Sequence, residues 1–288
     1  MAASNLWSDV SAISNSMREN AIFVIREQYL MQGLVTVKTD MTGLNPRIGY
    51  QYNQGTATTV GEGDDLTSSA FTPAALETLT PHEIGLQFFV TDSRKESDSP
   101  EEIIRDGSME LGLAGGDQVE AGLITAMASL TGGTIGTAGT AITWGYLAAA
   151  IARARNANKS ASAPVVAVIH GYQAAVLAKS ASLAGATTIA ATGVADQVTK
   201  QGMGQAFTFM GVPIYQVFGG VDTLDDFTGG VFPRAAIAID WRRPIRIEDE
   251  RDASRRGTEF NMSAVFATGV WRPKLGVKMI FDASAPSS

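Results

Sequence analysis

Residues 47–77 read RIGYQYNQGTATTVGEGDDLTSSAFTPAALE, a polar stretch rich in Gly and Thr with few large apolar side chains. Ile48, Tyr50 and Tyr52 alternate along its first part, a pattern typical of one face of a strand. Residues 61–65, GEGDD, have the composition of a turn at a loop tip. The stretch cannot bury a core of its own, so we expect an extended arm that needs a surface on another molecule.

The residues after this arm predict a strand and then a long helix. Apolar residues alternate from Glu83 to Val90, and we expect this strand to be the return leg of the arm. Ser99-Pro100-Glu101-Glu102 has an N-cap residue, a proline at the first helical position and acidic residues facing the helix dipole. A helix from there to about Leu130 is on the order of 45 Å long. Its predicted packing face consists largely of small side chains: Ile104, Leu111, Ala114, Gly115, Gln118, Ala121, Gly122 and Thr125.

Flanking segments predict further helices and strands. Residues 4–32 have apolar side chains at helical spacing, and residues 35–39 suit a short strand. Thr143 suits the N-cap of a helix over 144–156. A β-branched apolar run at 164–169 is followed by a helix over 172–182, which has α/β character. Four more strands are expected: 212–218, 231–241, 258–271 and 274–282.

Composition excludes several classes of protein. A net charge of −7 argues against a chain that grips nucleic acid by counterion release, although an acidic protein can still enclose DNA. The absence of cysteine removes disulfides, Cys-based zinc sites and Cys nucleophiles, and it suits a reducing cytoplasm. The N-terminal residues lack the basic start and apolar core of a signal peptide. No apolar run approaches the roughly 20 residues of a membrane span, so we expect no membrane association.

Candidate catalytic residues are sparse. His82 has no second histidine four residues on, and His170 follows an apolar strand without a nucleophile elbow elsewhere in the chain. The glycines of 132–136 and 202–204 match neither the dinucleotide fingerprint nor a phosphate loop. The acidic residues of 62–65 lack the twelve-residue calcium loop. We therefore expect no enzyme, cofactor or metal; a soluble α/β enzyme with a pocket near His170 is the alternative.

Charged residues gather at two places. The acidic turn suits contact with a basic patch on a neighbouring molecule. The run from 242 to 256 carries six arginines and four acidic residues. This run suits a solvated strand face, contacts between subunits or contact with DNA, and these readings stay open. The candidate interface residues are Glu62, Asp64, Asp65, Arg242, Arg243, Arg246, Arg251, Arg255 and Arg256.

Several segments, taken in order, carry a family resemblance. The polar arm and capped helix are followed by APVVAVIH at 163–170, QGMG at 201–204 and GVPIY at 211–215. AIAID at 236–240 and LGV at 275–277 close the chain. This order, which covers nearly the whole chain, resembles the major capsid protein of tailed bacteriophages, with the Hong Kong 97-type fold.

The resemblance implies an α+β fold with five segments. These are an N-terminal arm (1–46), an extended E-loop (47–80), a peripheral domain with a long spine helix (81–159), an axial domain (160–235) and a return to the peripheral domain (236–288). It also implies a structural shell subunit whose pentamers and hexamers close into an icosahedral head in the virion. Such a head encloses double-stranded DNA without sequence-specific binding and assembles in the host cytoplasm.

Two departures from the family bear on partners. The type member links an E-loop lysine covalently to a neighbour, but here no lysine lies between Lys38 and Lys95. We therefore expect non-covalent contacts or a separate cement protein. Only about 46 residues precede the E-loop, which implies a separate scaffolding protein or none, and a portal protein is a further expected partner. The alternative within the same fold is an encapsulin-type nanocompartment that encloses a cargo enzyme.

Overall fold

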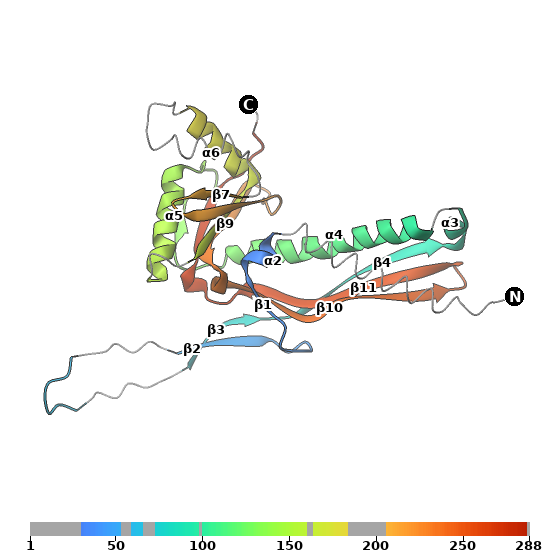
Figure 1. Ribbon diagram of the computed structural model, residues 1–288, viewed down its shortest axis with the longest axis horizontal. Helices are drawn as coiled ribbons and strands as arrows, with labels where there is room; N and C mark the ends of the chain where they lie inside the picture. Colours follow the sequence, from blue (N-terminus) through green and yellow to red (C-terminus); the bar gives the residue numbers. More distant parts are fainter. Residues whose placement is uncertain are drawn as a thin grey trace.

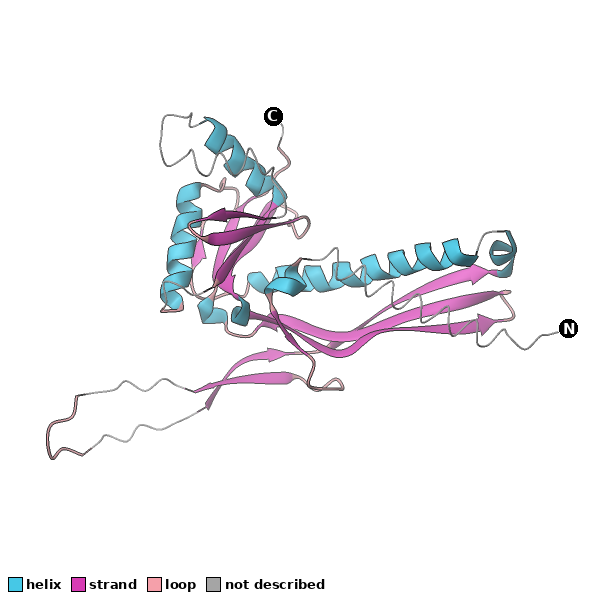
Figure 2. Ribbon diagram, viewed as in Figure 1, coloured by secondary structure: helices cyan, strands magenta, loops and turns pink. Residues whose placement is uncertain are grey.

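The computed structural model describes residues 30–52, 59–65, 73–97, 100–159, 164–183 and 206–286. A four-stranded sheet with one long helix forms an elongated lobe, and a six-stranded sheet with two helices forms a second lobe at one end of it (Figures 1 and 2). A two-stranded hairpin projects from the junction of the lobes. Helices and sheets are both present and largely segregated, which confirms the predicted α+β fold class.

The elongated lobe is built on a long antiparallel hairpin. Strands β10 and β11 pair along most of their length, β4 pairs antiparallel with β11, and β1 pairs parallel with β10. The register shifts twice in β10, around Arg243 and before Arg246. Pro244 lies between these positions and has no N–H to donate, which accounts for a break in the ladder there. The four strands are β1 (Thr36–Lys38), β4 (His82–Thr91), β10 (Ile237–Asp252) and β11 (Gly257–Val270).

Helix α4 (Pro100–Met127) runs along this sheet close to its predicted bounds, after the short helix α3 (Asp92–Ser97). Ser99, its predicted N-cap, and the side chain of Ile104 lie outside the described residues. The predicted packing face was partly wrong, because Gln118, Ala121 and Thr125 are exposed. The helix turns its larger apolar residues inward instead, since these remove more apolar surface from water. The buried stripe comprises Leu111, Gly115, Val119, Leu123 and Met127.

The projecting hairpin consists of β2 (Arg47–Tyr52) and β3 (Pro73–Leu79). Arg47 pairs with Leu79 at its base, and Tyr52 pairs with Pro73 at the far end of the ladder. The predicted return leg at 83–90 was therefore wrong, because β3 returns the arm and β4 pairs with β11. Val90 of β4 is buried with apolar residues of α4 and β11, so burial draws this strand into the sheet.

The second lobe is a mixed sheet in the order β5-β12-β9-β6-β8-β7. Val165, Ala167 and Ile169 of β6 pack with the two helices, whereas Val168 packs into the core beside α4. Burial on both faces explains the continuous apolar run in the sequence. The elements are α5 (Trp144–Ala157), α6 (Gly171–Leu183), β5 (Thr134–Ile135), β6 (Val165–His170), β7 (Ala206–Phe209), β8 (Val212–Val217), β9 (Asp226–Pro233) and β12 (Val277–Asp282).

The chain crosses between the lobes three times, first between α4 and β5. The predicted strand over 231–241 is split by η1 (Arg234–Ala236), where the chain leaves β9 and enters β10. It crosses back through η2 (Pro273–Leu275), between β11 and β12. Helix α5 and strand β12 thus pack in the second lobe, whereas the sequence-based segments place them with the first.

A shared core closes the junction between the lobes. Leu123 and Met127 of α4 pack there with Phe232 and Phe266, and with the short helix α2 (Met31–Leu34). The helix predicted over 4–32 lies outside the described residues apart from its last residues, where α2 begins. One continuous core therefore spans parts of both sheets and holds the two lobes together.

Candidate interaction surfaces

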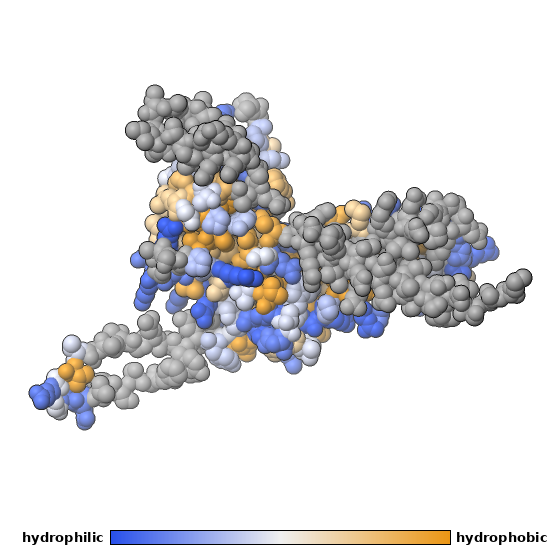
Figure 3. All heavy atoms as spheres, in the orientation of Figure 1, coloured by the Kyte–Doolittle hydropathy of each residue, from blue (hydrophilic) through white to orange (hydrophobic). Residues whose placement is uncertain are grey.

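The tip of the hairpin arm is acidic and exposed. Residues 59–65 lie at the far end of the arm, and hydrophilic side chains dominate there (Figures 1 and 3). The N–H of Asp64 donates to the carbonyl of Gly61 at 3.2 Å, and Gly63 takes a φ of +92°, which confirms the predicted turn. Glu62, Asp64 and Asp65 are exposed, and no cation of the described residues pairs with them.

The base of the arm is held by a buried charge cluster. The guanidinium of Arg47 donates to Asp240 through Nε at 2.8 Å and Nη2 at 3.1 Å. It also donates two hydrogen bonds to Asp40, at 2.7 and 3.1 Å. The hydrogen bonds to Asp240, and then those to Asp40, raise the pKa of Arg47 further above its usual value. This bidentate geometry anchors the first residue of β2 to strand β10.

Arg242 completes the cluster from within. Its side chain exposes no surface, and Nη2 lies 2.8 Å from Oδ2 of Asp240, although the angle does not satisfy a hydrogen bond. Leu79 of the hairpin packs on Ala238, two residues before Asp240, so the arm covers the face of β10 that also carries Arg242. Arg242 is therefore buried within the subunit, and its side chain cannot contact a neighbouring subunit.

The other arginines of the charged run lie at the surface. Arg243 pairs with Glu83, and Arg246 pairs with Glu248. Arg251 binds Asp92 through two hydrogen bonds of 2.6 and 2.7 Å. The described structure thus uses much of this run for ion pairs within one chain, which is the arrangement of a solvated strand face.

The hairpin between β10 and β11 carries the last two arginines. Arg255 pairs with Glu259 at 2.7 Å, and its guanidinium lies over the ring of Phe89, 4.1 Å from the centroid. Arg256 is exposed at a φ of +52° in the turn. Of the two, Arg255 is already engaged, so Arg256 is the freer cation for a contact with another molecule.

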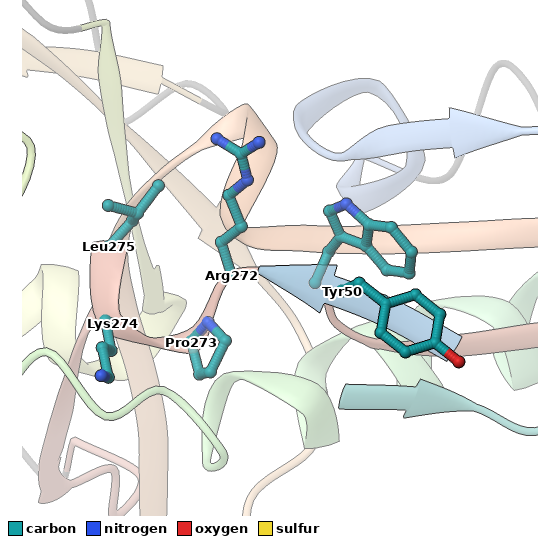
Figure 4. A pocket seen from close by; sticks show the side chains of 7 residues that line it. Tyr50, Arg272, Pro273, Lys274 and Leu275 are labelled. Atoms are coloured by element: carbon teal, nitrogen blue, oxygen red, sulfur yellow. The ribbon is translucent and has the colours of Figure 1, made fainter. Parts of the chain in front are cut away.

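A basic pocket lies where the arm meets the crossing through η2, and the sequence analysis did not predict it (Figure 4). Its volume is about 220 Å³, and it is lined by Gly49, Tyr50, Trp271, Arg272, Pro273, Lys274 and Leu275. A cluster of Trp, Arg, Pro and Lys directly after a predicted strand was the only available signal. Its meeting with β2, more than 200 residues away, depends on the fold.

Both histidines have structural surroundings. His170 is buried, and burial lowers its pKa. The N–H of Tyr172 lies 3.2 Å from Nδ1, and that of Gly219 lies 3.4 Å from Nε2. A neutral imidazole has one acceptor nitrogen, so only one of the two contacts is a full hydrogen bond. The ring thereby ties the start of α6 to the end of β8.

His82 packs edge-on against Phe266, with 4.7 Å between the ring centroids. Across the described ranges, no group of three His, Asp or Glu side chains is placed to hold a metal ion. None of the helices in those ranges is long and apolar enough to cross a membrane. The surfaces described above are charged faces and a projecting arm.

Comparisons with known proteins identify the family. Residues 75–279 match the family model described as phage capsid protein. No curated protein sequence matches the chain. The structure is similar to that of Mycobacterium phage Che8, with a TM-score of 0.63 and 18% identity over 88% of this chain and 91% of the other. It is also similar to the head structure of Helicobacter pylori bacteriophage KHP40, with a TM-score of 0.65 and 11% identity over 87% and 88% of the two chains.

A third similar structure is a virus-like particle from Pyrococcus furiosus. Its TM-score is 0.60 and its identity 10%, over 92% of this chain and 98% of the other. At these identities the similarity shows a shared fold, the Hong Kong 97-type fold that the sequence predicted. The family model spans most of the chain, from the return strand of the arm to β12. The chain therefore belongs to the phage capsid protein family and is a structural shell subunit of a virion.

Proposed function

We propose that this subunit forms pentamers and hexamers that close into an icosahedral head around double-stranded DNA. Residues 47–80 act as the E-loop and lie over a neighbouring subunit. The lobe with α4 is the peripheral domain, and the six-stranded lobe is the axial domain that lines the centre of each capsomer. Assembly takes place in the host cytoplasm, with scaffolding, portal and cement proteins as further partners.

The projecting arm is the observation that carries this proposal. It leaves the body of the chain at a base anchored by Arg47 and Asp240, and its tip is exposed on every described residue. A stable obligate interface typically buries more than about 2,000 Å². An arm of this length adds contact area far from the body of the subunit, and repetition around a closed shell makes modest contacts durable together.

The overall charge supports enclosure of DNA rather than a grip on it. The chain carries a net charge of −7, and ion pairs within the chain engage most arginines of the 242–256 run. Tight binding by counterion release requires many free cations. A shell of this charge holds packaged DNA by closure, and we infer no sequence-specific contact.

The test is to shorten the arm while keeping its base. Because Tyr52 pairs with Pro73, replacing residues 54–72 by one glycine leaves Asn53-Gly as a two-residue turn between the strands. We expect a folded subunit that forms no shells in negative-stain micrographs. Closed particles from this variant would contradict the proposed role of the arm. The full-length chain, prepared in the same way, is the control.

The contents of native particles separate a phage head from an encapsulin-type nanocompartment. The proposal expects nuclease-protected double-stranded DNA in native particles. A co-purified enzyme in particles without DNA would favour the nanocompartment. A small soluble oligomer with turnover dependent on His170 would instead favour the α/β enzyme, but the contacts of His170 are those of a packing residue.

A further inference from the structure

The two ends of the arm carry opposite charges that have no ion-pair partner among the described residues. At the tip, Glu62, Asp64 and Asp65 are exposed without a cation beside them among the described residues. At the base, Arg272 and Lys274 are exposed, and no described carboxylate pairs with either. The same arm thus presents an acidic tip and sits on a basic pocket.

The pocket is a built site rather than a loose pair of side chains. Trp271 packs against β2 so closely that a Cβ on Gly49 would lie 3.2 Å from its ring. The N–H groups of Trp271 and Arg272 both donate to the carbonyl of Ala236, at 2.7 and 3.0 Å. These contacts fix the backbone at Trp271 and Arg272, from which the Arg272 side chain extends. Tyr50 of β2 also lines the pocket, on the other side of Arg272 from Lys274 and Leu275 (Figure 4).

Further positive charge adjoins the pocket. The ammonium of Lys38 lies over the ring of Trp271, 3.9 Å from its centroid. Of the residues that line the pocket, all of them described, two are cations and none is a carboxylate. Aromatic side chains beside three cations, Lys38, Arg272 and Lys274, suit a carboxylate-bearing loop, because charge-assisted hydrogen bonds are the stronger ones.

A subunit cannot fill its own pocket with its own tip. Gly63 lies fourteen residues beyond Gly49. At about 3.3 Å per residue an extended strand of that length spans on the order of 45 Å. Figure 1 shows the tip at the end of the arm, pointing away from both lobes. An arm tip that fills the pocket must therefore come from another copy.

The competing β10–β11 hairpin has two of its three arginines engaged, and Arg256 stays exposed. Arg251 and Arg255 of the β10–β11 hairpin pair with Asp92 and Glu259 in the same chain. The carboxylates of a neighbouring subunit would have to displace Asp92 and Glu259 from these arginines. At Arg272 and Lys274 no ion pair between described residues has to be broken first. The free energy of a new ion pair is therefore more fully available at the pocket.

We propose that the acidic tip of one subunit, Glu62 to Asp65, docks in the Tyr50–Trp271–Arg272–Lys274 pocket of a second copy. This inference rests on the proposed shell function and adds to it the receiving site of the arm. The contact takes the place of the covalent link that an E-loop without lysine cannot form. When this contact is repeated around a capsomer, the arm tip of each subunit binds at the arm base of the next subunit.

Engineered disulfides test the contact directly, because the chain has no cysteine of its own. Particles of the D64C/K274C double variant are oxidised and run on a denaturing gel without reductant. We expect a ladder of linked subunits that collapses to monomer on reduction, since a disulfide needs the two Cβ atoms within about 4.5 Å. The matched control is D64C/R256C, which joins the same tip to the other basic hairpin.

The outcomes are distinct. A ladder with K274C and none with R256C supports the pocket. A ladder with R256C alone, or with neither pair in well-formed shells, overturns it. If the unmodified chain forms no shells under any condition, including with its scaffolding protein, the proposed function fails before the pocket is in question.

Charge reversal gives an independent readout. We expect E62K/D64K/D65K and R272E/K274E each to raise the concentration for half-maximal assembly by about tenfold or more, because like charges would meet. Combining the two sets of substitutions in one chain should recover assembly, because every contact then joins opposite charges again. Circular dichroism of each variant checks that the subunit still folds. Unchanged assembly in folded reversal variants would overturn the proposal.

Discussion

Replacing Asp240 with alanine should strongly destabilise the folded subunit. The Asp240 side chain exposes no surface, and it faces the guanidinium groups of Arg47 and Arg242. After the substitution Arg47 keeps its pair with Asp40, which lies at the surface. Arg242 loses the carboxylate beside it and keeps a fully buried charge. The small cavity left by the carboxylate group is a minor effect beside that uncompensated charge.

The magnitude follows from the burial. Breaking a buried ion pair by removing one partner costs about 3–5 kcal/mol, because the remaining charge is left without compensation. Since one of the two arginines keeps a partner, we expect a loss of about 4 kcal/mol in the free energy of unfolding. Folded domains have only about 5–15 kcal/mol in total, so this loss takes a large share.

Urea denaturation of the dispersed subunit, followed by tryptophan fluorescence, measures the change. The transition midpoint should fall while its slope stays the same, because the surface exposed on unfolding is unchanged. The matched control is Asp92→Ala, which removes the carboxylate of another bidentate pair, with Arg251. That pair is half exposed, so we expect no measurable shift of the midpoint.

Equal midpoints for the two variants would refute this reasoning. So would a loss below about 1 kcal/mol for Asp240→Ala, the range of an exposed pair. Either result would mean that the buried guanidinium of Arg242 is stabilised by solvent or by a group other than Asp240. The anchoring of the arm through Arg47 would then need another account.

Two further predictions concern pH and glycine. Burial raises the pKa of Glu120, which accepts a hydrogen bond from the N–H of Met31, to about 7. The contribution of Glu120 to stability should therefore be full below about pH 4.5 and fall as pH rises towards 7, by about 1–2 kcal/mol after allowance for solvent screening. The difference in stability between the unmodified chain and E120Q should follow this profile. Gly136 has a φ of +83°, and a Cβ there would lie 2.4 Å from the ring of Phe281, so G136A should destabilise by about 2–4 kcal/mol in thermal unfolding.

Each of these predictions has a control in the chain. For Glu120, a profile that rises with pH or stays unchanged in E120Q would contradict the assigned sign. For Gly136, the control is G139A, because Gly139 has a φ of +71° and nothing within 4 Å of a Cβ. Its loss should be only about 1 kcal/mol, from the backbone conformation alone. Equal losses at the two positions would remove the steric argument.

Local patterns predicted much of the secondary structure. The helix expected after Ser99 spans Pro100–Met127, and the helix expected after Thr143 spans Trp144–Ala157. The hydroxyl of Thr143 accepts from the N–H of Tyr146 at 3.3 Å, as an N-cap residue does. Capping and turn chemistry act over a few neighbouring residues, so they can be read directly from the sequence.

Pairing between distant residues could not be read in this way. The alternation of apolar residues correctly predicted β4 as a strand, but we assigned this strand to the arm. An alternating pattern carries no information about which strand is the partner, and β4 pairs with β11. The face of α4 was also misjudged, since small residues suit either a close contact or an exposed groove. Strand partners and buried faces depend on the free energy of the whole core, to which residues far apart contribute.

The sequence by itself determined that a polar arm leaves the body of the chain, that a long capped helix follows it, and that the order of segments is that of a capsid protein. Only the tertiary structure decided which charges are free. It buried Arg242 beside Asp240, paired Arg251 with Asp92, and brought Arg272 and Lys274 to the base of the arm. The physical reason is that a charge's partner and its exposure to water are set by residues that approach in space, and these lie far apart along the chain.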